Sequence, residues 1–301
     1  MLKLEAVHAF IVVAEAGSIS EAARRLGLSK SLISDRLTDL EQRLGARLIH
    51  RTSRKLALTE DGLLFLERAR GLIRDSEAAV TEIAARRGEL VGTLRIGGPV
   101  SFSVLHLAPA LTGFLEAHPG IDINLDVEDR LVDLGAGGHD AVVRHGPVQD
   151  GWITAVRLAT SRRVLVASET YLAAHGEPTS LAELEGHHGI LYTNRTIDWR
   201  FDGPNGPAIV HPRPRLRVNN GLVMRDAAAA GVGIALLPTF MMQGAPAGLR
   251  VLDVGAEAEG AEINLAFLKH QGASVRLRAL IDHLQARFGD PPYWDRSPAP
   301  A

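Results

Sequence analysis

The 301-residue sequence contains no cysteine, which excludes disulfides, thiol redox chemistry and zinc sites built on thiolates. No apolar run approaches the roughly 18 residues that a membrane span needs, and the first ten residues, MLKLEAVHAF, do not form a signal peptide. Several catalytic motifs are also missing: G-x-S-x-G, a P-loop, H-E-x-x-H, and G-x-G-x-x-G after a strand. These absences predict a cytoplasmic protein that is not an enzyme and has no cofactor or metal.

Residues 18–45 have the pattern of two short helices joined by a tight turn. Ser18 and Glu21 form an S-x-x-E capping box at the start of the first helix, and Gly27 permits the turn that follows it. Ser29 is suited to cap the second helix. Apolar residues recur along that helix at positions 33, 37, 40 and 44, and its opposite face is polar. This pattern predicts a helix-turn-helix, although the spacing alone suits any helical hairpin equally well.

Basic charge is concentrated around this motif. Residues 20–60 contain nine Lys or Arg and five Asp or Glu, a net charge of +4, whereas residues 91–301 contain 18 basic and 22 acidic residues, a net charge of −4. A local excess of positive charge is what binding to DNA phosphates requires. We therefore expect double-stranded DNA to bind the N-terminal part of the chain.

The order of residues across 22–62 resembles that of the LysR-type transcriptional regulators. The resemblance rests on A-A-x-x-L-x-x-S-x-S-x-x-S, L-E-x-x-L-G-x-x-L, H-R-T-S-R and L-T-E-x-G. Here these motifs comprise Ala22, Ala23, Leu26, Ser29, Ser31, Ser34, Leu40, Glu41, Leu44, Gly45, Leu48, Arg51, Arg54, Leu58, Thr59 and Gly62. The rest of the chain has the length and organisation of that family.

The resemblance implies a winged helix-turn-helix domain at 1–58, a linker and dimerisation helix at 59–87, and an effector-binding domain at 88–301. It also implies a homodimer through the linker helix and a homotetramer through the effector domains. The DNA site would be an interrupted inverted repeat, the effector a small and plausibly anionic metabolite, and RNA polymerase a candidate partner.

The residues expected at the DNA fall into two groups. Phosphates would be held by basic and hydroxyl side chains, which fix position but not sequence: Lys30, Ser31, Arg51, Thr52, Ser53 and Arg54. The second helix, which begins at Ser29, would turn Ser31, Ser34, Asp35 and Thr38 toward the major groove. The Asp35 carboxylate can accept a hydrogen bond from cytosine N4; a salt bridge to Arg24 or Arg36 is an equally open alternative.

Two further helices are expected beside this motif. Residues 2–16 have the apolar stripe of an amphipathic helix that supports the helix-turn-helix. A longer helix begins at Thr59 and runs to about Arg87. Its apolar and small residues form a heptad seam: Leu66, Ala69, Ile73, Ser76, Val80 and Ile83. We expect this seam to pair with a second chain; packing against its own domain is the alternative.

Beyond a linker at 88–92, short strands alternate with helices. The expected strands are 94–96, 121–127, 140–144, 164–167, 190–192, 216–218, 234–237 and 263–267, and the expected helices are 105–118, 181–185, 221–230 and 274–288. This alternation predicts an α/β fold with mainly parallel sheets. The resemblance implies two subdomains of the periplasmic-binding-protein type, the first at about 91–161 and 266–301 and the second at about 162–265. The segment from Pro291 onward is expected to be a loose tail.

An effector cleft is expected where the turn at 97–101 links a strand to a helix. Free backbone N–H groups at such a turn favour a carboxylate or another anion, and ligands of α/β sheets bind outside the carboxyl ends of the strands. The resemblance places around this cleft Val100, Ser101, Phe102, Ser103, His145, Tyr192, Asn194, Trp199, Asn219, Asn220, Pro238 and Phe240. Each of them taken alone is equally well explained as a cap, turn or core residue.

The histidines add one hypothesis. His145 occupies a position that is usually apolar in the family, and we expect it to tune the choice of effector, because a histidine can donate or accept hydrogen bonds and titrate near neutral pH. His187 and His188 point apart in a strand and lack a carboxylate at ligand spacing, so a metal site there is not favoured. The rival to a regulator is a solute-binding or catalytic α/β protein with a DNA-anchoring N-terminal domain that lacks sequence specificity.

Overall fold

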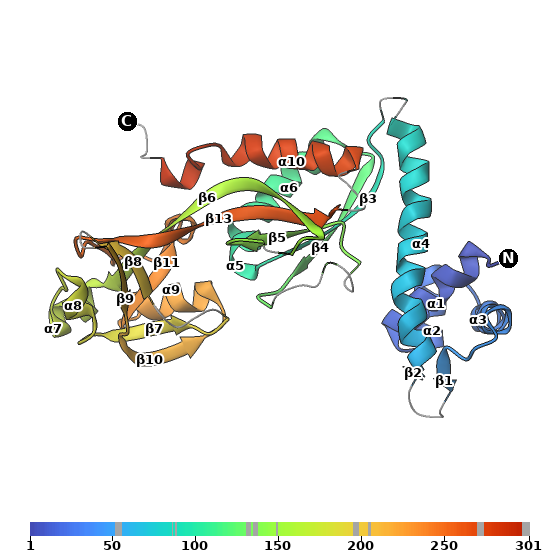
Figure 1. Cartoon of the computed structure of the whole chain (residues 1–301), viewed down its shortest axis with the longest axis horizontal. Coiled ribbons are helices and arrows are strands. Elements are labelled where there is room, and N and C mark those ends of the chain that lie inside the picture. Colours follow the sequence, from blue (N-terminus) through green and yellow to red (C-terminus); the bar gives the residue numbers. More distant parts are fainter. Residues whose placement is uncertain are drawn as a thin grey trace. The chain divides into compact units, whose positions relative to one another are not determined.

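The computed structural model describes residues 1–51, 56–85, 87, 89–130, 134, 138–148, 150–194, 199–203, 206–269 and 274–296. The chain forms two compact units, one built on Met1–Gly92 and the other on Thr93–Leu134 and His139–Ala301. Figure 1 labels the helices and strands of both units.

The first unit contains the predicted helix-turn-helix with a wing. Its elements are α1 (Leu4–Ala16), α2 (Ile19–Leu26), α3 (Lys30–Leu44), β1 (Ile49–Arg51), β2 (Leu56–Leu58) and α4 (Glu60–Ala85). Gly27 ends α2 in the left-handed region at φ 63°, which glycine adopts without steric cost. Ser29 Oγ accepts a hydrogen bond from the Leu32 N–H at 3.2 Å, so it caps α3 as predicted. β1 and β2 pair antiparallel and form the wing.

The capping box at α2 is only half formed. Ser18 Oγ accepts from the Glu21 N–H at 3.4 Å. The Glu21 carboxylate does not return to the Ser18 backbone but accepts hydrogen bonds from Arg24 at 2.6 Å and Arg25 at 3.1 Å. These two guanidinium groups lower the pKa of Glu21 to about 2. The predicted helix start is therefore confirmed, but the side chain of Glu21 has a different partner.

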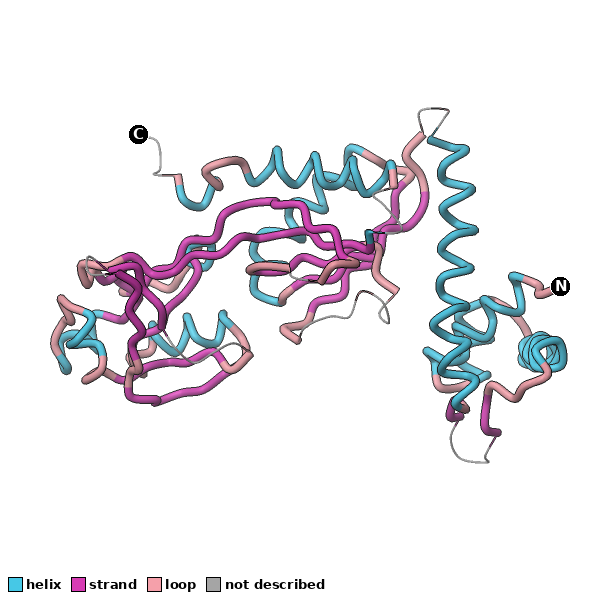
Figure 2. The backbone as a smooth tube through the Cα atoms, viewed as in Figure 1, coloured by secondary structure: helices cyan, strands magenta, loops and turns pink. Residues whose placement is uncertain are grey.

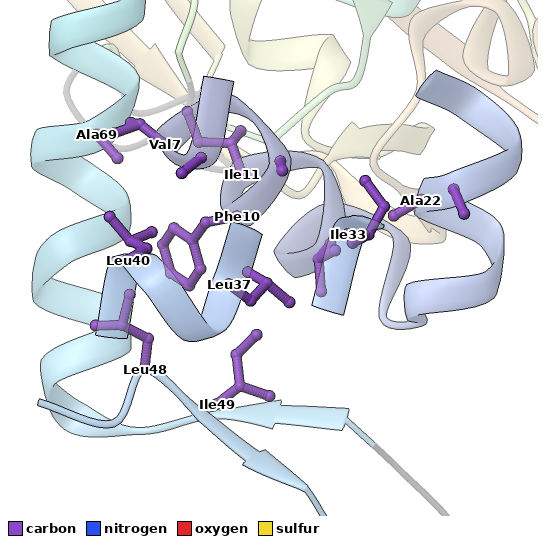
Figure 3. Packing of buried hydrophobic residues seen from close by; sticks show 14 residues of the cluster. Val7, Phe10, Ile11, Ala22, Ile33, Leu37, Leu40, Leu48, Ile49 and Ala69 are labelled. Carbon is purple, nitrogen blue, oxygen red and sulfur yellow. The ribbon is translucent and has the colours of Figure 1, made fainter. Parts of the chain in front are cut away.

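The core of the first unit joins all four helices to the wing. Phe10, Leu37 and Leu40 are almost completely buried, and Leu48 and Ile49 extend the cluster into the wing (Figure 3). Burying a side chain of this size contributes roughly 1.5–3 kcal/mol. This core holds α3 against α1 and leaves the polar face of α3 free.

The long helix α4 shares this core along its first half only. Ala69 is fully buried, and Leu66 and Ile73 pack against the same cluster. At these three positions the alternative prediction, that the seam packs against its own domain, was right, because α4 packs on α1 of the same unit. Farther along the same seam, Val80 and Ile83 are 67% and 60% exposed, so the described part of the chain does not cover these two side chains.

The second unit is built on one twisted mixed sheet with the strand order β10–β7–β11–β6–β13–β5–β3–β4. Its strands are β3 (Gly92–Gly98), β4 (Ile121–Val127), β5 (Ala141–His145), β6 (Ile153–Ser168), β7 (His188–Tyr192), β8 (Trp199–Gly203), β9 (Gly206–Val210), β10 (Arg213–Val218), β11 (Ile234–Pro238), β12 (Leu249–Leu252) and β13 (Glu257–Leu268). Its helices are α5 (Val100–Phe102), the π-helix η1 (Ser103–Leu107), α6 (Ala108–Ala117), α7 (Glu169–His175), α8 (Leu181–Leu184), α9 (Gly221–Ala229), the 3₁₀-helix η2 (Thr239–Met242), α10 (Val275–Phe288) and the 3₁₀-helix η4 (Tyr293–Asp295).

The prediction of mainly parallel sheets was wrong. β7 pairs parallel with β10 and β11, and β3 pairs parallel with β5, but β6 and β13 are long strands that pair antiparallel with each other and with their other neighbours. Figure 2 shows both strands running through a first lobe (β3–β5, α5, α6, α10) and a second lobe (β7–β12, α7–α9). Their register shifts twice, between Ala258 and Ala261 and between Ile263 and Asn264.

The helical run Val100–Ala117 departs from the expectation that no apolar stretch could span a membrane. Among the described residues it is the one helix that is long and apolar enough to do so, with a mean hydropathy of 1.3 over 18 residues. Phe102, Leu107 and Phe114 are fully buried inside the second unit. Its apolar side chains thus serve as core.

The described part of the C-terminal segment, residues 291–296, packs on the second unit, which corrects the expectation of a loose tail for these residues. Trp294 packs on His106 at a ring distance of 4.7 Å, and Tyr293 Oη lies 2.6 Å from His106 Nδ1. His106 Nε2 lies 3.0 Å from the Phe240 carbonyl oxygen, which can only accept, so Nε2 carries the proton and Nδ1 accepts from the Tyr293 hydroxyl. Burial lowers the pKa of His106, which fits this neutral form.

Candidate functional sites

The polar face of α3 is presented to solvent as predicted. Ser31, Asp35 and Thr38 are exposed and Ser34 is half-buried. Lys30 is exposed at the first position of the helix. Ser29 also lies here, but its hydroxyl caps α3 and contacts Ser31 Oγ at 3.0 Å. These side chains form one surface that is free of the core.

Both salt bridges considered for Asp35 are absent among the described residues. Arg24 binds Glu21, and Arg36 binds Glu5 across the α1–α3 contact at 3.0 Å. The Asp35 carboxylate therefore faces solvent beside Ser31 and Thr38. Of the two interpretations of this residue, the ion-pair alternative was wrong.

The wing supplies the other predicted DNA contacts. Arg51 ends β1; Thr52, Ser53 and Arg54 lie outside the described residues. Glu41 and Gly62 fix the base of the wing, a role that the family motifs contain but that was not predicted. Glu41 Oε1 accepts from the N–H groups of Leu48 at 2.8 Å and Ile49 at 3.2 Å.

Gly62 permits a close approach between α4 and the base of the wing. A Cβ atom at this position would collide with the Leu48 carbonyl oxygen. Thr59 Oγ1 accepts from the Gly62 N–H at 2.9 Å and donates to the Arg47 carbonyl at 2.6 Å. The T-E-x-G motif thus joins the start of α4 to the chain that enters β1.

A cavity of ≈ 750 Å³ lies within the second unit. Seven of the predicted effector residues line it: Ser101, Phe102, His145, Tyr192, Asn194, Trp199 and Pro238. They come from α5, β5, β7, β8 and β11 and from the turn after β7, so both lobes contribute. The cavity wall combines apolar side chains with many polar and charged ones.

Five predicted residues are not in the lining. Phe240 is fully buried behind Phe102, with ring centroids 5.2 Å apart. Ser103 is 1% exposed and faces Gly98. Asn219 is exposed, and the Val100 N–H and the Asn220 side chain are engaged by Asp129.

Most charged residues in the lining were not predicted as site residues; the exception is Arg144, which precedes His145 in a loop that was expected to border the cleft. The wall contains three carboxylates and three guanidinium groups: Glu128, Asp129, Asp150, Arg130, Arg144 and Arg163. Arg144 pairs with Asp150 at 4.0 Å and its side chain is only 13% exposed. Ser161 of β6 adds a hydroxyl at 2% exposure. Their local sequences resemble ordinary strand ends and edges, so only the fold reveals their convergence.

Ser101 is the predicted residue whose environment points most directly to a ligand. It lines the cavity, is 4% exposed, and its hydroxyl has no hydrogen-bond partner among the described residues. Buried hydroxyls are nearly always hydrogen-bonded, because leaving one unsatisfied costs free energy. A ligand atom in the cavity would supply the missing partner.

A second hollow borders three histidines of the second lobe. His175, His187 and His188 line it together with Glu177 and Glu183. Tyr171 holds the cluster by stacking on His175 at 4.3 Å and contacting His187 Nδ1 at 3.2 Å. Among the described residues no group of three or more His, Asp or Glu side chains is arranged to hold a metal ion.

Comparison with known proteins agrees with this architecture. Residues 4–63 match the family described as bacterial regulatory helix-turn-helix protein, lysR family, and residues 87–289 match the LysR substrate binding domain. The chain is 30% identical over 292 residues to the HTH-type transcriptional regulator CrgA of Neisseria meningitidis serogroup C, across 95% of this chain and 97% of that protein. It is 32% identical over 298 residues to PtxR of Pseudomonas aeruginosa, across 97% and 95%.

Solved structures give the same result. The full-length virulence activator AphB of Vibrio cholerae superposes with a TM-score of 0.62 and 27% identity, covering 94% of this chain and 99% of that one. The structure of CrgA from Neisseria meningitidis superposes with a TM-score of 0.59 and 29% identity, covering 94% and 97%. The predicted family is therefore confirmed, and this chain belongs to the LysR-type transcriptional regulators, with a helix-turn-helix DNA-binding domain followed by an effector-binding domain.

Proposed function

We propose that this regulator binds an interrupted inverted repeat as a dimer and that a small anionic metabolite in the second-unit cavity changes how it engages the DNA. The observation that carries the effector part is the buried hydroxyl of Ser101 in the cavity wall, which has no hydrogen-bond partner in the described part of the chain. The same wall contains the guanidinium groups of Arg130, Arg144 and Arg163, a side-chain type that binds carboxylates, beside an equal number of carboxylates. We infer that the protein acts by binding and not by catalysis.

Coupling between ligand and DNA requires an effector that prefers one arrangement of the chain over another. Both lobes contribute side chains to the cavity, so a ligand that contacts both would bind differently when the lobes move. His145 is a further candidate for effector choice, because it lines the cavity and its ring lies 5.6 Å from that of Phe102.

The test is a gel-shift titration of the full chain on the DNA upstream of its own gene, with a panel of small organic acids. We expect specific retardation at roughly 10 nM protein or below and an altered shift with one class of acid. Ser101→Ala should weaken the response to that acid and leave DNA affinity unchanged. Thr112→Ala, which removes an exposed hydroxyl from the same helical run, should keep the response. Weak and equal binding to every fragment would contradict the proposal of sequence specificity.

Asp35 provides a separate test of base readout. Asp35→Ala is expected to change which operator sequence is preferred, because loss of a base contact costs about 1–3 kcal/mol at one base pair only. Lys30→Ala, the control, should weaken binding to all sequences alike and flatten the salt dependence by about one unit. Competition binding with randomised half-sites distinguishes the two. An equal loss on every sequence for Asp35→Ala would argue against readout.

We propose two contacts between copies of this chain. The exposed second half of the α4 seam would pair two chains, and the sheet edges of the effector domains would join two dimers. The edge strand β10 exposes Arg213, Arg215 and Arg217, whereas the edge strand β4 exposes Asp122 and Asp126. Opposite charges at the two ends of one sheet favour a head-to-tail contact between copies. RNA polymerase is a further candidate partner.

A further inference from the structure

Asp129 has hydrogen-bond partners from both lobes. Its Oδ1 accepts from the N–H of Val100, the first residue of the helical run 100–117, at 3.1 Å. Its Oδ2 accepts from Asn220 Nδ2 at 2.7 Å, and its backbone carbonyl accepts from Asn194 Nδ2 at 2.7 Å. Val100 belongs to the first lobe, whereas Asn194 and Asn220 belong to the second. Asp129 therefore bridges the lobes beside the cavity that it lines.

The donors around this carboxylate are held in place by other contacts. Asn220 caps α9, since its Oδ1 accepts from Leu222 at 3.0 Å and Val223 at 3.2 Å, and this leaves Nδ2 directed at Asp129. The Glu128 N–H donates to the Gly98 carbonyl at 3.0 Å and so fixes the chain next to Asp129. A carboxylate is favoured at this helix start, because the first N–H groups of a helix are unpaired and the helix dipole is positive there.

The position at which the sequence predicts a ligand anion is thus filled by the protein's own carboxylate. Ser101 follows Val100 and lines the cavity, and its buried hydroxyl has no partner among the residues that the structure describes. Two carboxylates cannot share one set of donors at low cost, because like charges at this distance repel. An incoming anion that reaches the Val100 N–H must therefore move Asp129 out.

We propose that Asp129 is a built-in competitor that occupies the anion position of the ligand-free cavity, and that an anionic effector binds by displacing its carboxylate from Val100 and Asn220. This inference rests on the proposed function, in which the effector is an anion bound in this cavity. Displacement breaks the hydrogen bond between the Asp129 carboxylate and Asn220 and leaves the one between Asn194 and the Asp129 carbonyl, so ligand binding removes one of the two contacts by which Asp129 bridges the lobes. It also sets a requirement for tight binding, because a ligand must replace both hydrogen bonds that the Asp129 carboxylate makes with Val100 and Asn220.

The test uses the full chain and three probes of equal size: benzoate, benzamide and benzylamine, titrated by calorimetry. Asp129→Ala is expected to bind benzoate about tenfold more tightly than the unmodified chain, because the apparent affinity is no longer reduced by the fraction of molecules in which the position is filled. Benzamide affinity should not change. Asp282→Ala removes the same charge from an exposed position of α10 and is the matched control; it should bind all three probes like the unmodified chain.

Asp129→Asn, which keeps the volume of the side chain, guards against misfolding of the alanine variant. Fluorescence of the three tryptophans, all of which lie outside residues 1–92, reports that the second unit of each variant is folded. Equal benzoate affinity in the variants and the unmodified chain overturns the displacement. A parallel gain for benzamide also overturns it, because added space would then explain the effect. If Asp129→Ala leaves the benzoate affinity unchanged, but small acids still alter the gel shift in a way that depends on Ser101, only the proposal that Asp129 is displaced is contradicted. If the unmodified chain binds benzylamine and Asp129→Ala loses it, Asp129 is a ligand for cations and the anionic effector fails as well.

Discussion

Replacing Glu41 by alanine is expected to lower the free energy of unfolding of the first unit by roughly 2–5 kcal/mol, because two buried N–H groups lose a charged acceptor. Glu41 is 8% exposed, and its Oε1 binds the N–H groups of Leu48 and Ile49 at the entry to the wing. The same loss should abolish specific DNA binding, since it frees the wing from α3. Glu41→Gln retains an acceptor oxygen and should keep most of the stability.

The two units can be followed separately in a urea titration. All three tryptophans, at positions 152, 199 and 294, lie outside residues 1–92, so tryptophan fluorescence reports the second unit, whereas far-UV circular dichroism reports both. In Glu41→Ala, the unfolding of the helix-rich first unit, seen by circular dichroism, should occur at a lower urea concentration. The unfolding of the second unit, seen by tryptophan fluorescence, should not shift. A circular dichroism transition within about 0.5 kcal/mol of that of the unmodified chain, the size of an ordinary surface substitution, would refute this role.

Changing Val80 and Ile83 together to aspartate is expected to halve the mass in solution and to weaken operator binding by about 100-fold or more. Both side chains are largely exposed on the seam that Ala69 and Ile73 continue into the core. Burying two carboxylates in an apolar helix–helix contact costs more free energy than the contact contributes. Two DNA-binding domains that are joined in one dimer bind the operator more tightly, because the second domain binds at a high effective concentration. This typically raises the affinity 10²–10⁴-fold, and the gain is lost when the dimer separates.

Sedimentation equilibrium and gel shifts on a full operator and on a single half-site measure both effects. Affinity for the half-site should remain, because the exposed face of α3 is untouched. Arg87→Asp, an exposed position at the end of α4, changes the charge by the same amount and should preserve the mass. An unchanged mass in the double variant would exclude the second half of α4 as the contact between chains.

Features governed by local chemistry were predictable. The caps of α2 and α3, the apolar spacing of α3 and the turn at Gly27 each depend on residues within a few positions, so the helix-turn-helix could be predicted at residue level. The seam of α4 shows where this fails. Leu66 and Val80 have the same periodicity, but only the tertiary fold places the first against α1 and leaves the second exposed.

The cavity also combines residues that local sequence predicts with residues that only the tertiary fold brings together. Ser101 and Phe102 follow a strand-to-helix turn that is recognisable in the sequence. Asp129 was missed because its partners are distant: Val100 lies 29 residues away and Asn220 lies 91 residues away. Phe240 was placed at the cavity because of its position after β11, whereas Phe102 separates it from the space. The length of β6 was missed because only its apolar end, at 164–167, has a buried-strand pattern.

The two long strands determine how this effector domain can move. Because β6 and β13 run unbroken through both lobes, the lobes cannot swing about a single residue; the double-stranded ribbon must twist along its length. Twist concentrates where the register is irregular, and Ala261, which pairs with Ser161, lies between the two register shifts of β13. Both residues line the cavity. The metabolite proposed for this cavity would therefore rest against the part of the ribbon where the register is irregular, and its binding would change the torsion of the ribbon.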